Sequence, residues 1–231
     1  MSFTDSITAL EIKDTTDFEQ LEIEINQGQP EVIGFNFENG PGLYVDNYAF
    51  RGNSGIPLGT IPENMFNYAA QNLNCKLVIL HYGLNVVGHE TGDYSWYLNP
   101  FRKVIQKIKK TYPNATIVLA SVGDKSFNYG KQYHTEPDIP LFVGMQVKLA
   151  KEENIVFWNM YKAMGGYDSM KRWVEDQPKR AAKDYTHLNH EGAKEIANLF
   201  YSWLMDEYNK FLEKKIEVVS KQQINIQNQT L

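Results

Sequence analysis

The sequence predicts an α/β domain, in which helices cover both faces of a parallel sheet, preceded by a short β-rich segment. Three short apolar runs have the length and composition of buried strands, and they lie at residues 76–80, 116–120 and 155–158. Amphipathic stretches of helical length alternate with these runs. Such alternation favours parallel strands joined by right-handed crossovers, and ligands bind to these sheets beyond the carboxyl ends of the strands.

The first 42 residues show a different pattern. Apolar and polar residues alternate with a period of two, which is typical of half-exposed strands, at residues 7–13, 21–25 and 32–37. Asn39-Gly40-Pro41-Gly42 predicts a turn, and residues 43–50 predict one more strand. We therefore expect residues 1–42 to form a β-rich segment and the α/β domain to begin at residue 43.

Helical periodicity dominates the rest of the chain. The predicted helices lie at residues 60–74, 94–111, 138–152, 168–175 and 189–212. Pro113 ends the second of them, because proline lacks the amide hydrogen that a continuing helix needs. Residues 213–231 lose the apolar period and become polar, so we expect the α/β domain to end at residue 212 and a frayed tail to follow.

The composition argues against several classes of protein. The net charge of −5 and the lack of a basic block speak against nucleic acid as the main partner, because phosphate binding requires clustered cations. No stretch approaches the roughly 20 apolar residues that span a bilayer. Residues 1–25 are acidic and lack the apolar core of a secretory signal, so the location stays open. The single cysteine, Cys75, is expected in or near the core.

The segment Asp184-Tyr185-Thr186-His187, directly before the last predicted helix, is the strongest indication of catalysis. An acid three residues before a histidine can lie on the same side of one turn. The carboxylate can then hold one imidazole nitrogen while the other nitrogen takes a proton, which is the base half of a serine-hydrolase site. The alternative is a helix-capping Asp184 or Thr186 beside an exposed histidine.

Two loops after predicted strands can supply the hydrogen-bond donors that ester hydrolysis needs. The backbone N–H of Gly52 and the side-chain amide of Asn85 are both suited to an oxyanion. Taken alone, Gly52 also fits a tight turn, and Asn85 also fits a helix cap. Their occurrence at strand ends, together with Asp184 and His187, favours the catalytic interpretation.

These segments resemble sequence blocks of the SGNH (GDSL-type) hydrolase superfamily. Asn47-Tyr-Ala-Phe-Arg-Gly52 is similar to the second block, Gly83-Leu84-Asn85 to the third, and Asp184-x-x-His187 to the fifth. The segment from Trp158 to Val174 resembles bacterial, Bacteroidetes-like esterases that act on O-acylated cell-wall or polysaccharide sugars. The resemblance covers about residues 43–210.

The resemblance implies a three-layer α/β/α sandwich with a parallel, flavodoxin-like sheet. It implies that His187 is the base, that Asp184 orients it, and that Gly52 and Asn85 are the oxyanion-hole donors, with no metal or organic cofactor. The implied partner is an acylated carbohydrate or another small ester. For a full-length form, the implied location is periplasmic or secreted.

The first block departs from the family pattern, in which an apolar strand ends in Gly-Asp-Ser and the serine is the nucleophile. The nearest segment is Phe3-Thr4-Asp5-Ser6-Ile7-Thr8, where Thr4 replaces the glycine and only two residues precede Phe3. Because two residues are too few for the central strand, we expect Ser6 to be an ordinary strand or loop residue and the nucleophile to be missing. Residues 1–42 are similar to the end of a β-rich accessory module that related enzymes carry between the first and second blocks.

Other residues give weaker indications. His187 and His190 with Glu191 suggest a zinc site, but no third and fourth ligand has a convincing spacing, so no metal is expected. Further candidates for the rim of the site, each also consistent with packing or a turn, are His81, Tyr82, His89, Asp124 and Tyr185.

Two functions follow from the sequence. The first is an ester hydrolase domain whose serine lies outside this chain, which predicts little or no serine-dependent esterase activity from the polypeptide alone. The second is a non-catalytic carbohydrate-binding protein or a scaffold that a partner completes. A sheet without its central strand exposes an edge, so self-association is expected if the sheet is incomplete.

Overall fold

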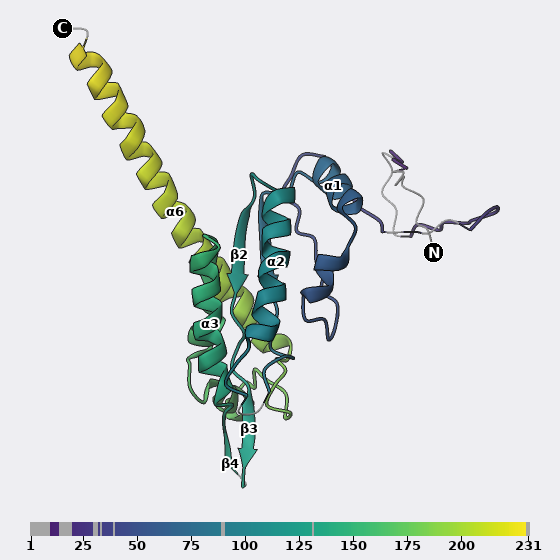
Figure 1. Ribbon diagram of the computed structural model, residues 1–231, viewed down its shortest axis with the longest axis vertical. Helices are drawn as coiled ribbons and strands as arrows, with labels where there is room; N and C mark the ends of the chain where they lie inside the picture. The colour runs from purple at the N-terminus through teal and green to yellow at the C-terminus, as the bar shows by residue number, and fades with distance from the viewer. Residues whose placement is uncertain are drawn as a thin grey trace. The chain divides into compact units, whose positions relative to one another are not determined.

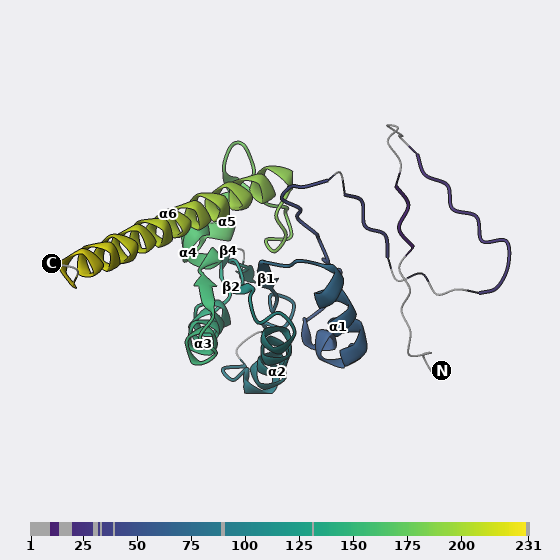
Figure 2. The ribbon, with the colours of Figure 1, turned by 90° about the horizontal axis from the view of Figure 1, so that it is seen from above.

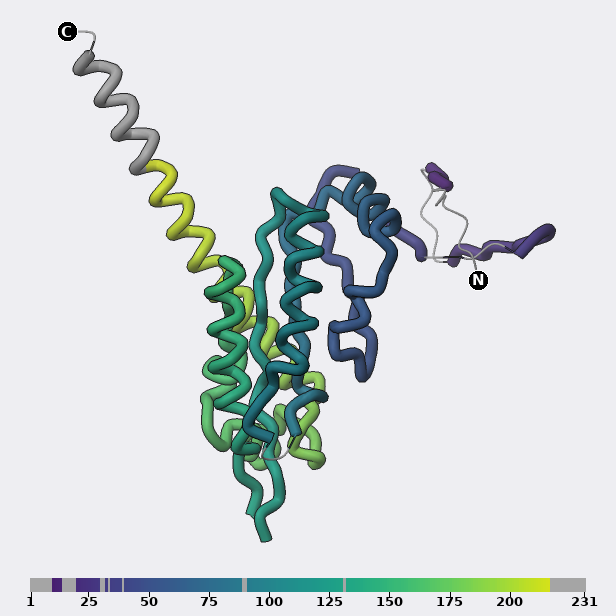
Figure 3. The backbone as a smooth tube through the Cα atoms, viewed as in Figure 1, coloured from purple at the N-terminus to yellow at the C-terminus, as the bar shows by residue number. Residues whose placement is uncertain are grey.

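The computed structural model describes residues 10–13, 20–29, 32, 34–38, 40–88, 91–130 and 132–229, with side chains of the last helix as far as Ile216 (Figure 1). The chain divides into two units, Met1–Arg51 and Gly52–Leu231. Figure 3 traces the backbone within each unit. No helix in the described ranges combines the length and apolar character needed to cross a membrane.

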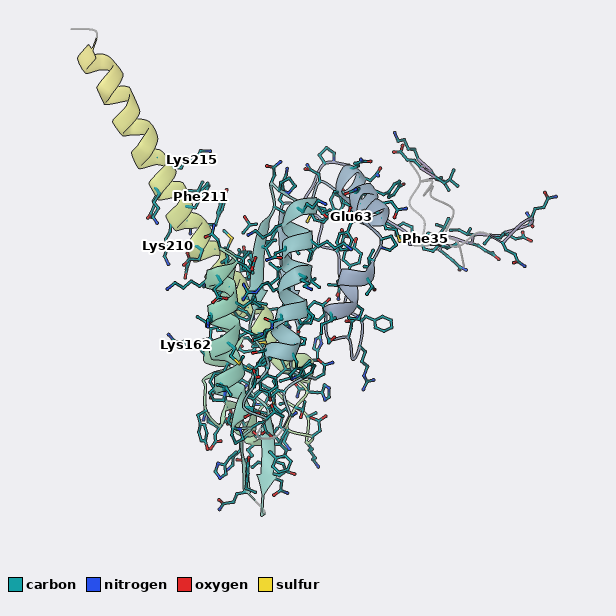
Figure 4. The ribbon with its side chains drawn as sticks, viewed as in Figure 1. Phe35, Glu63, Lys162, Lys210, Phe211 and Lys215 are labelled. Atoms are coloured by element: carbon teal, nitrogen blue, oxygen red, sulfur yellow. The ribbon has the colours of Figure 1, made fainter. Side chains whose placement is uncertain are left out.

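The first unit has no strand or helix among its described residues. Leu43 and Val45 are 93% and 86% exposed, and Phe35, which Figure 4 labels, is also exposed. An alternating pattern forms a strand only where a neighbour pairs with its backbone and covers its apolar face. The strands predicted at residues 21–25 and 43–50 are therefore wrong. The other expectations for this unit lie wholly or partly outside the described residues: strands at 7–13 and 32–37, the turn at 39–42 and the role of Ser6.

The second unit is built on a parallel sheet of three strands. The strands are β1 (Leu77–His81), β2 (Thr116–Ala120) and β5 (Val156–Trp158), in the order β1-β2-β5. β2 lies in the middle, and Val118 is opposite Ile79 of β1 and Val156 of β5. These strands coincide with the three apolar runs, so this prediction is confirmed.

Helices precede, connect and follow the strands. In chain order they are the 3-10 helix η1 (Ile56–Thr60), α1 (Glu63–Asn72), α2 (Ser95–Thr111), α3 (Asp138–Glu152), α4 (Met160–Met164), α5 (Ser169–Glu175) and α6 (His190–Gln229). The single helix predicted at 60–74 is wrong in detail, because Pro62 separates η1 from α1. The positions of α2, α3 and α5 agree with the prediction to within one residue.

Alternate residues of β2 face two separate hydrophobic clusters. Ile117 and Leu119 belong to the cluster that includes side chains of α2 and α3. Val118 and Ala120 belong to the cluster that includes side chains of α4, α5 and α6. Figure 2 shows the sheet between these two groups of helices. The predicted α/β fold, with a parallel sheet flanked by helices, is therefore confirmed.

The structure adds two features that the sequence did not predict. A hairpin of β3 (Ser126–Tyr129) and β4 (Gln132–Thr135) stands where we expected a loop. α6 runs to Gln229, although a frayed tail was expected after residue 212. The backbone stays helical because residues 213–229 contain no glycine or proline and are rich in Lys, Glu and Gln, which have high helix propensity.

Candidate active site

The loop after β1, the loop after β2 and the turn before α6 meet at the carboxyl end of the sheet (Figure 1). Two consecutive residues after β2 join the other two segments. Lys125 Nζ donates to the carbonyl oxygen of Val87 at 3.1 Å, and the backbone N–H of Ser126 donates to the carbonyl oxygen of Tyr185 at 2.9 Å. The segments that carry Asn85 and His187 are therefore attached to one short stretch of chain.

Asp184 and His187 form a direct hydrogen bond in the turn before α6. The distance between Asp184 Oδ2 and His187 Nδ1 is 2.8 Å. The other carboxylate oxygen, Oδ1, accepts the backbone N–H groups of Thr186 and His187, both at 3.0 Å. Partial burial by itself raises the pKa of Asp184, but these hydrogen bonds outweigh it, so the pKa lies below the ordinary value of 3.8. The carboxylate is therefore ionised at neutral pH.

The turn differs from the helical geometry that the sequence suggested. α6 begins only at His190, and Tyr185 has a left-handed backbone with φ of 55°. The backbone N–H of Ala182 donates to the carbonyl oxygen of His187 at 2.8 Å, which closes the turn. The ring of Tyr185 stacks on Tyr133 of β4, with centroids 3.5 Å apart and planes at 2°. Tyr185 therefore packs against the hairpin and helps to hold the turn.

Gly52 and Asn85 also lie in direct contact. Asn85 Nδ2 donates to the carbonyl oxygen of Gly52 at 2.9 Å, although 33 residues separate the two in sequence. Gly52 has a φ of 74°, a left-handed conformation that glycine adopts without strain. The buried side chain of Tyr97 holds the same loop, because its hydroxyl donates to the carbonyl oxygen of Ser54 at 2.7 Å.

Gly83 explains why a glycine stands two residues before Asn85. Its φ is 114°, and a Cβ atom added there would lie 2.7 Å from the ring of Phe142, closer than real carbon atoms approach. The carbonyl oxygen of Gly83 accepts the backbone N–H of Val86 at 2.9 Å. The glycine lets the chain turn tightly against α3 and presents Asn85 on the exposed side of the loop.

Gln146 is a supporting residue that the sequence analysis missed. It lies on α3 and is 1% exposed. Its Oε1 accepts the backbone N–H of Val122 at 3.0 Å, and its Nε2 donates to the carbonyl oxygen of Tyr82 at 3.2 Å. It thus ties the loop after β1 to the loop after β2. The detectable signal was an amide side chain inside the apolar stripe of α3.

Asp124, a candidate for the rim, is buried instead. It accepts the hydroxyl of Thr135 at 2.9 Å and the backbone N–H of Met170 at 2.7 Å. Burial raises the pKa of Asp124, although these hydrogen bonds act in the opposite direction. Its role is to join the loop after β2 to β4 and α5. Tyr82 likewise packs, edge to face, against Phe101.

The remaining candidates receive little from the structure. Within the described ranges, no group of three or more His, Cys, Asp or Glu side chains has an arrangement suited to a metal ion. His187 uses Nδ1 for Asp184, and His190 is exposed in the first turn of α6. Ser6 and His89 lie outside the described residues.

A parallel sheet flanked by helices, with loops of this kind at its carboxyl end, is the architecture of the SGNH hydrolases. The chain belongs to the GDSL-like lipase/acylhydrolase family, which it matches over residues 5–195. The match begins at Asp5, one residue before Ser6. A comparison with curated proteins finds no match.

Several solved structures are similar to this chain. A peptidoglycan O-acetylesterase is 26% identical with a TM-score of 0.56, over 63% of this chain and 41% of that one. An acetyl xylan esterase is 21% identical with a TM-score of 0.43, over 60% and 73%. The periplasmic domain of a lipopolysaccharide acetyltransferase from Salmonella ser. Paratyphi A is 15% identical with a TM-score of 0.43, over 62% and 61%. The chain thus spans about two fifths of the first of these proteins.

Proposed function

We propose that this protein is an ester hydrolase that removes acyl groups, acetyl above all, from carbohydrates. In this proposal His187 is the general base, Asp184 orients it, and Gly52 and Asn85 stabilise the oxyanion. The observation that carries the proposal is the hydrogen bond between Asp184 Oδ2 and His187 Nδ1 at 2.8 Å. It leaves Nε2 as the ring nitrogen that can exchange a proton with a substrate or nucleophile.

The proposed mechanism follows the chemistry of serine esterases. His187 Nε2 takes the proton of a serine hydroxyl as that oxygen attacks the acyl carbon. The resulting imidazolium is stabilised by Asp184, whose low pKa keeps it charged. His187 then returns the proton to the departing sugar oxygen, and water cleaves the acyl-enzyme by the same steps.

The two proposed donors have capacity for an oxyanion. The amide of Asn85 carries two N–H groups, of which the carbonyl oxygen of Gly52 accepts one. The backbone N–H of Gly52 has no acceptor among the described residues. Both groups are exposed, and both belong to loops fixed by buried aromatic rings, those of Tyr97 and Phe142. Fixed donors of this kind stabilise charge without reorganising during the reaction.

The substrate class is supported by one comparison. The peptidoglycan O-acetylesterase that the chain resembles acts, by its name, on an acetyl ester of a carbohydrate polymer. An O-acetyl group on a sugar needs only a small acyl pocket and a proton for the sugar oxygen, and the proposed site requires no more than this chemistry.

The nucleophile is the part of the proposal that rests on the first block. β1 lies at one end of the sheet, and its outer edge pairs with no strand in the described ranges. Ile79 at its centre is 46% exposed, so a further strand can be added there. A parallel strand at this edge would end at the carboxyl end of the sheet, beside the loop of Asn85, and its terminal serine would face the proposed site. Ser6 is the candidate within this chain.

A serine-directed fluorophosphonate and an acetylated sugar test the proposal. We expect the chain itself to react slowly with the probe, and a fusion that adds an apolar strand ending in Gly-Asp-Ser at its N-terminus to react rapidly and to release acetate. Rapid labelling of Ser6 in the chain itself, lost in Ser6→Ala, would instead assign Ser6 as the nucleophile.

The same experiment separates the enzyme from the binding protein. Tight binding of the acetylated sugar without acetate release from either form, and with no labelled serine, would contradict the proposed hydrolase and favour the carbohydrate-binding function. A difference between the two forms in acetate release, abolished when the added serine is replaced by alanine, would support the hydrolase.

A further inference from the structure

α6 uses one of its faces to pack against the domain, and that face ends at Trp203. Phe200 and Trp203 lie in the hydrophobic cluster under β2, and Phe200 contacts Trp158 with ring centroids 5.0 Å apart. One turn and two turns further along the same face stand Glu207 and Lys210, whose side chains form an ion pair at 2.7 Å. The contact with the domain therefore stops where this face becomes charged, and the helix projects beyond it (Figures 1 and 2).

A second apolar stripe starts where the first one ends. It consists of Tyr201, Leu204, Met205, Tyr208, Phe211 and Leu212. Tyr201, Tyr208, Phe211 and Leu212 are 63%, 51%, 59% and 37% exposed. Figure 4 labels Phe211 together with Lys210 and Lys215 on the projecting part of the helix. The stripe is rotated away from the face that holds Trp203, so the domain beneath the start of α6 does not cover it.

The spacing of the stripe indicates another helix as its partner. Its members recur after seven residues, as Tyr201 and Tyr208, Leu204 and Phe211, and Met205 and Leu212. A seven-residue repeat keeps a seam aligned with a second helix over several turns. A projecting helix gains most of its stability from burying such a face, and large apolar side chains in a row are costly to leave in water.

The charges beside the stripe favour a second copy of this chain in antiparallel orientation. Asp206 and Glu207 precede the centre of the stripe, and Lys214 and Lys215 follow it. In an antiparallel pair the acidic end of one helix lies beside the basic end of the other, and a twofold axis creates this match twice. A parallel pair would instead place Lys215 beside the partner's Lys215.

We propose that the protein forms a twofold dimer through the stripe from Tyr201 to Leu212 on α6. The two helices lie antiparallel, with the aromatic and aliphatic side chains of the stripe between them and oppositely charged ends side by side. This interface is remote from the loops at the carboxyl end of the sheet, so it does not depend on the proposed esterase activity.

Light scattering on the full chain tests the dimer. We expect a molar mass twice the 26.6 kDa of the chain, falling to 26.6 kDa in the double variant Phe211→Gln, Leu212→Gln. Both side chains are exposed on the projecting helix, so the variant leaves the core of the domain intact, and an unchanged thermal unfolding of the domain checks this. The control is Lys210→Gln, on the charged side of α6, which should remain a dimer.

The orientation has its own test. Asp206→Lys with Glu207→Lys places like charges together in the antiparallel dimer and should weaken it. Adding Lys214→Glu and Lys215→Glu in the same chain exchanges both ends and should restore it. A wild-type monomer at all concentrations, or a dimer that survives Phe211→Gln, Leu212→Gln, would overturn the proposed interface. A dimer that the four-residue exchange fails to restore would overturn the antiparallel arrangement.

Discussion

Replacing His187 with alanine is expected to lower kcat for an acetylated sugar about 10⁴-fold in the fusion that carries a Gly-Asp-Ser strand. The substitution removes the only ring that Asp184 holds within the turn, at 2.8 Å, and with it the proton acceptor for the serine hydroxyl. KM should change little, since the imidazole acts on the serine and the leaving oxygen. Initial rates of acetate release measure the effect.

His190→Ala is the matched control for this prediction. His190 lies three residues further along, exposed in the first turn of α6, and has no part in the proposed chemistry. It should leave kcat within a factor of about two, because an isolated surface substitution rarely disturbs a site. Equal losses in the two variants, or full activity without His187, would remove the base from the proposal.

Replacing Asn85 with alanine is expected to lower kcat by roughly 10²- to 10³-fold, the effect of losing one oxyanion donor. Asn85 Nδ2 also donates to Gly52, so the free energy of unfolding must be measured with the rate to show that the loop survives. Asn85→Asp is the sharper variant, since it keeps the size but replaces a donor with a negative charge. It should be at least as slow as Asn85→Ala.

The control for Asn85 is Asn72→Ala. Asn72 is an exposed asparagine at the end of α1, and its side chain bonds only to the carbonyl oxygen of Tyr68 within the same helix. Its replacement should leave kcat unchanged. A normal kcat in Asn85→Ala, with the loop intact, would show that the oxyanion is stabilised by other groups.

Much of the fold could be predicted because burial leaves a simple pattern. β1, β2 and β5 are short and apolar, and α2 and α3 have clear apolar faces, so their positions follow from the sequence. The first unit shows the limit of this reasoning. Residues 21–25 and 43–50 alternate like strands, but alternation says nothing of whether a neighbouring strand exists, and none pairs with them in the described part of the chain.

The candidate site was predictable at the level of side chains and not at the level of its supports. A spacing of three residues is enough to suggest that Asp184 and His187 meet. The contact between Gly52 and Asn85 depends on the fold, and so do the ties made by Lys125 and Gln146. Those ties involve backbone carbonyl and amide groups, which every residue carries, so the sequence holds no mark of which ones will pair.

The central claim is that one site gathers the imidazole of His187 and the amide of Asn85 around the same ester. The most direct test is an NMR experiment on the Ser6→Ala variant, which removes the in-chain candidate nucleophile, saturated with an acetylated oligosaccharide. The claim predicts nuclear Overhauser effects from the acetyl methyl group to both the His187 ring and the Asn85 side-chain amide in one complex. Effects that reach one of these side chains and never the other would contradict it.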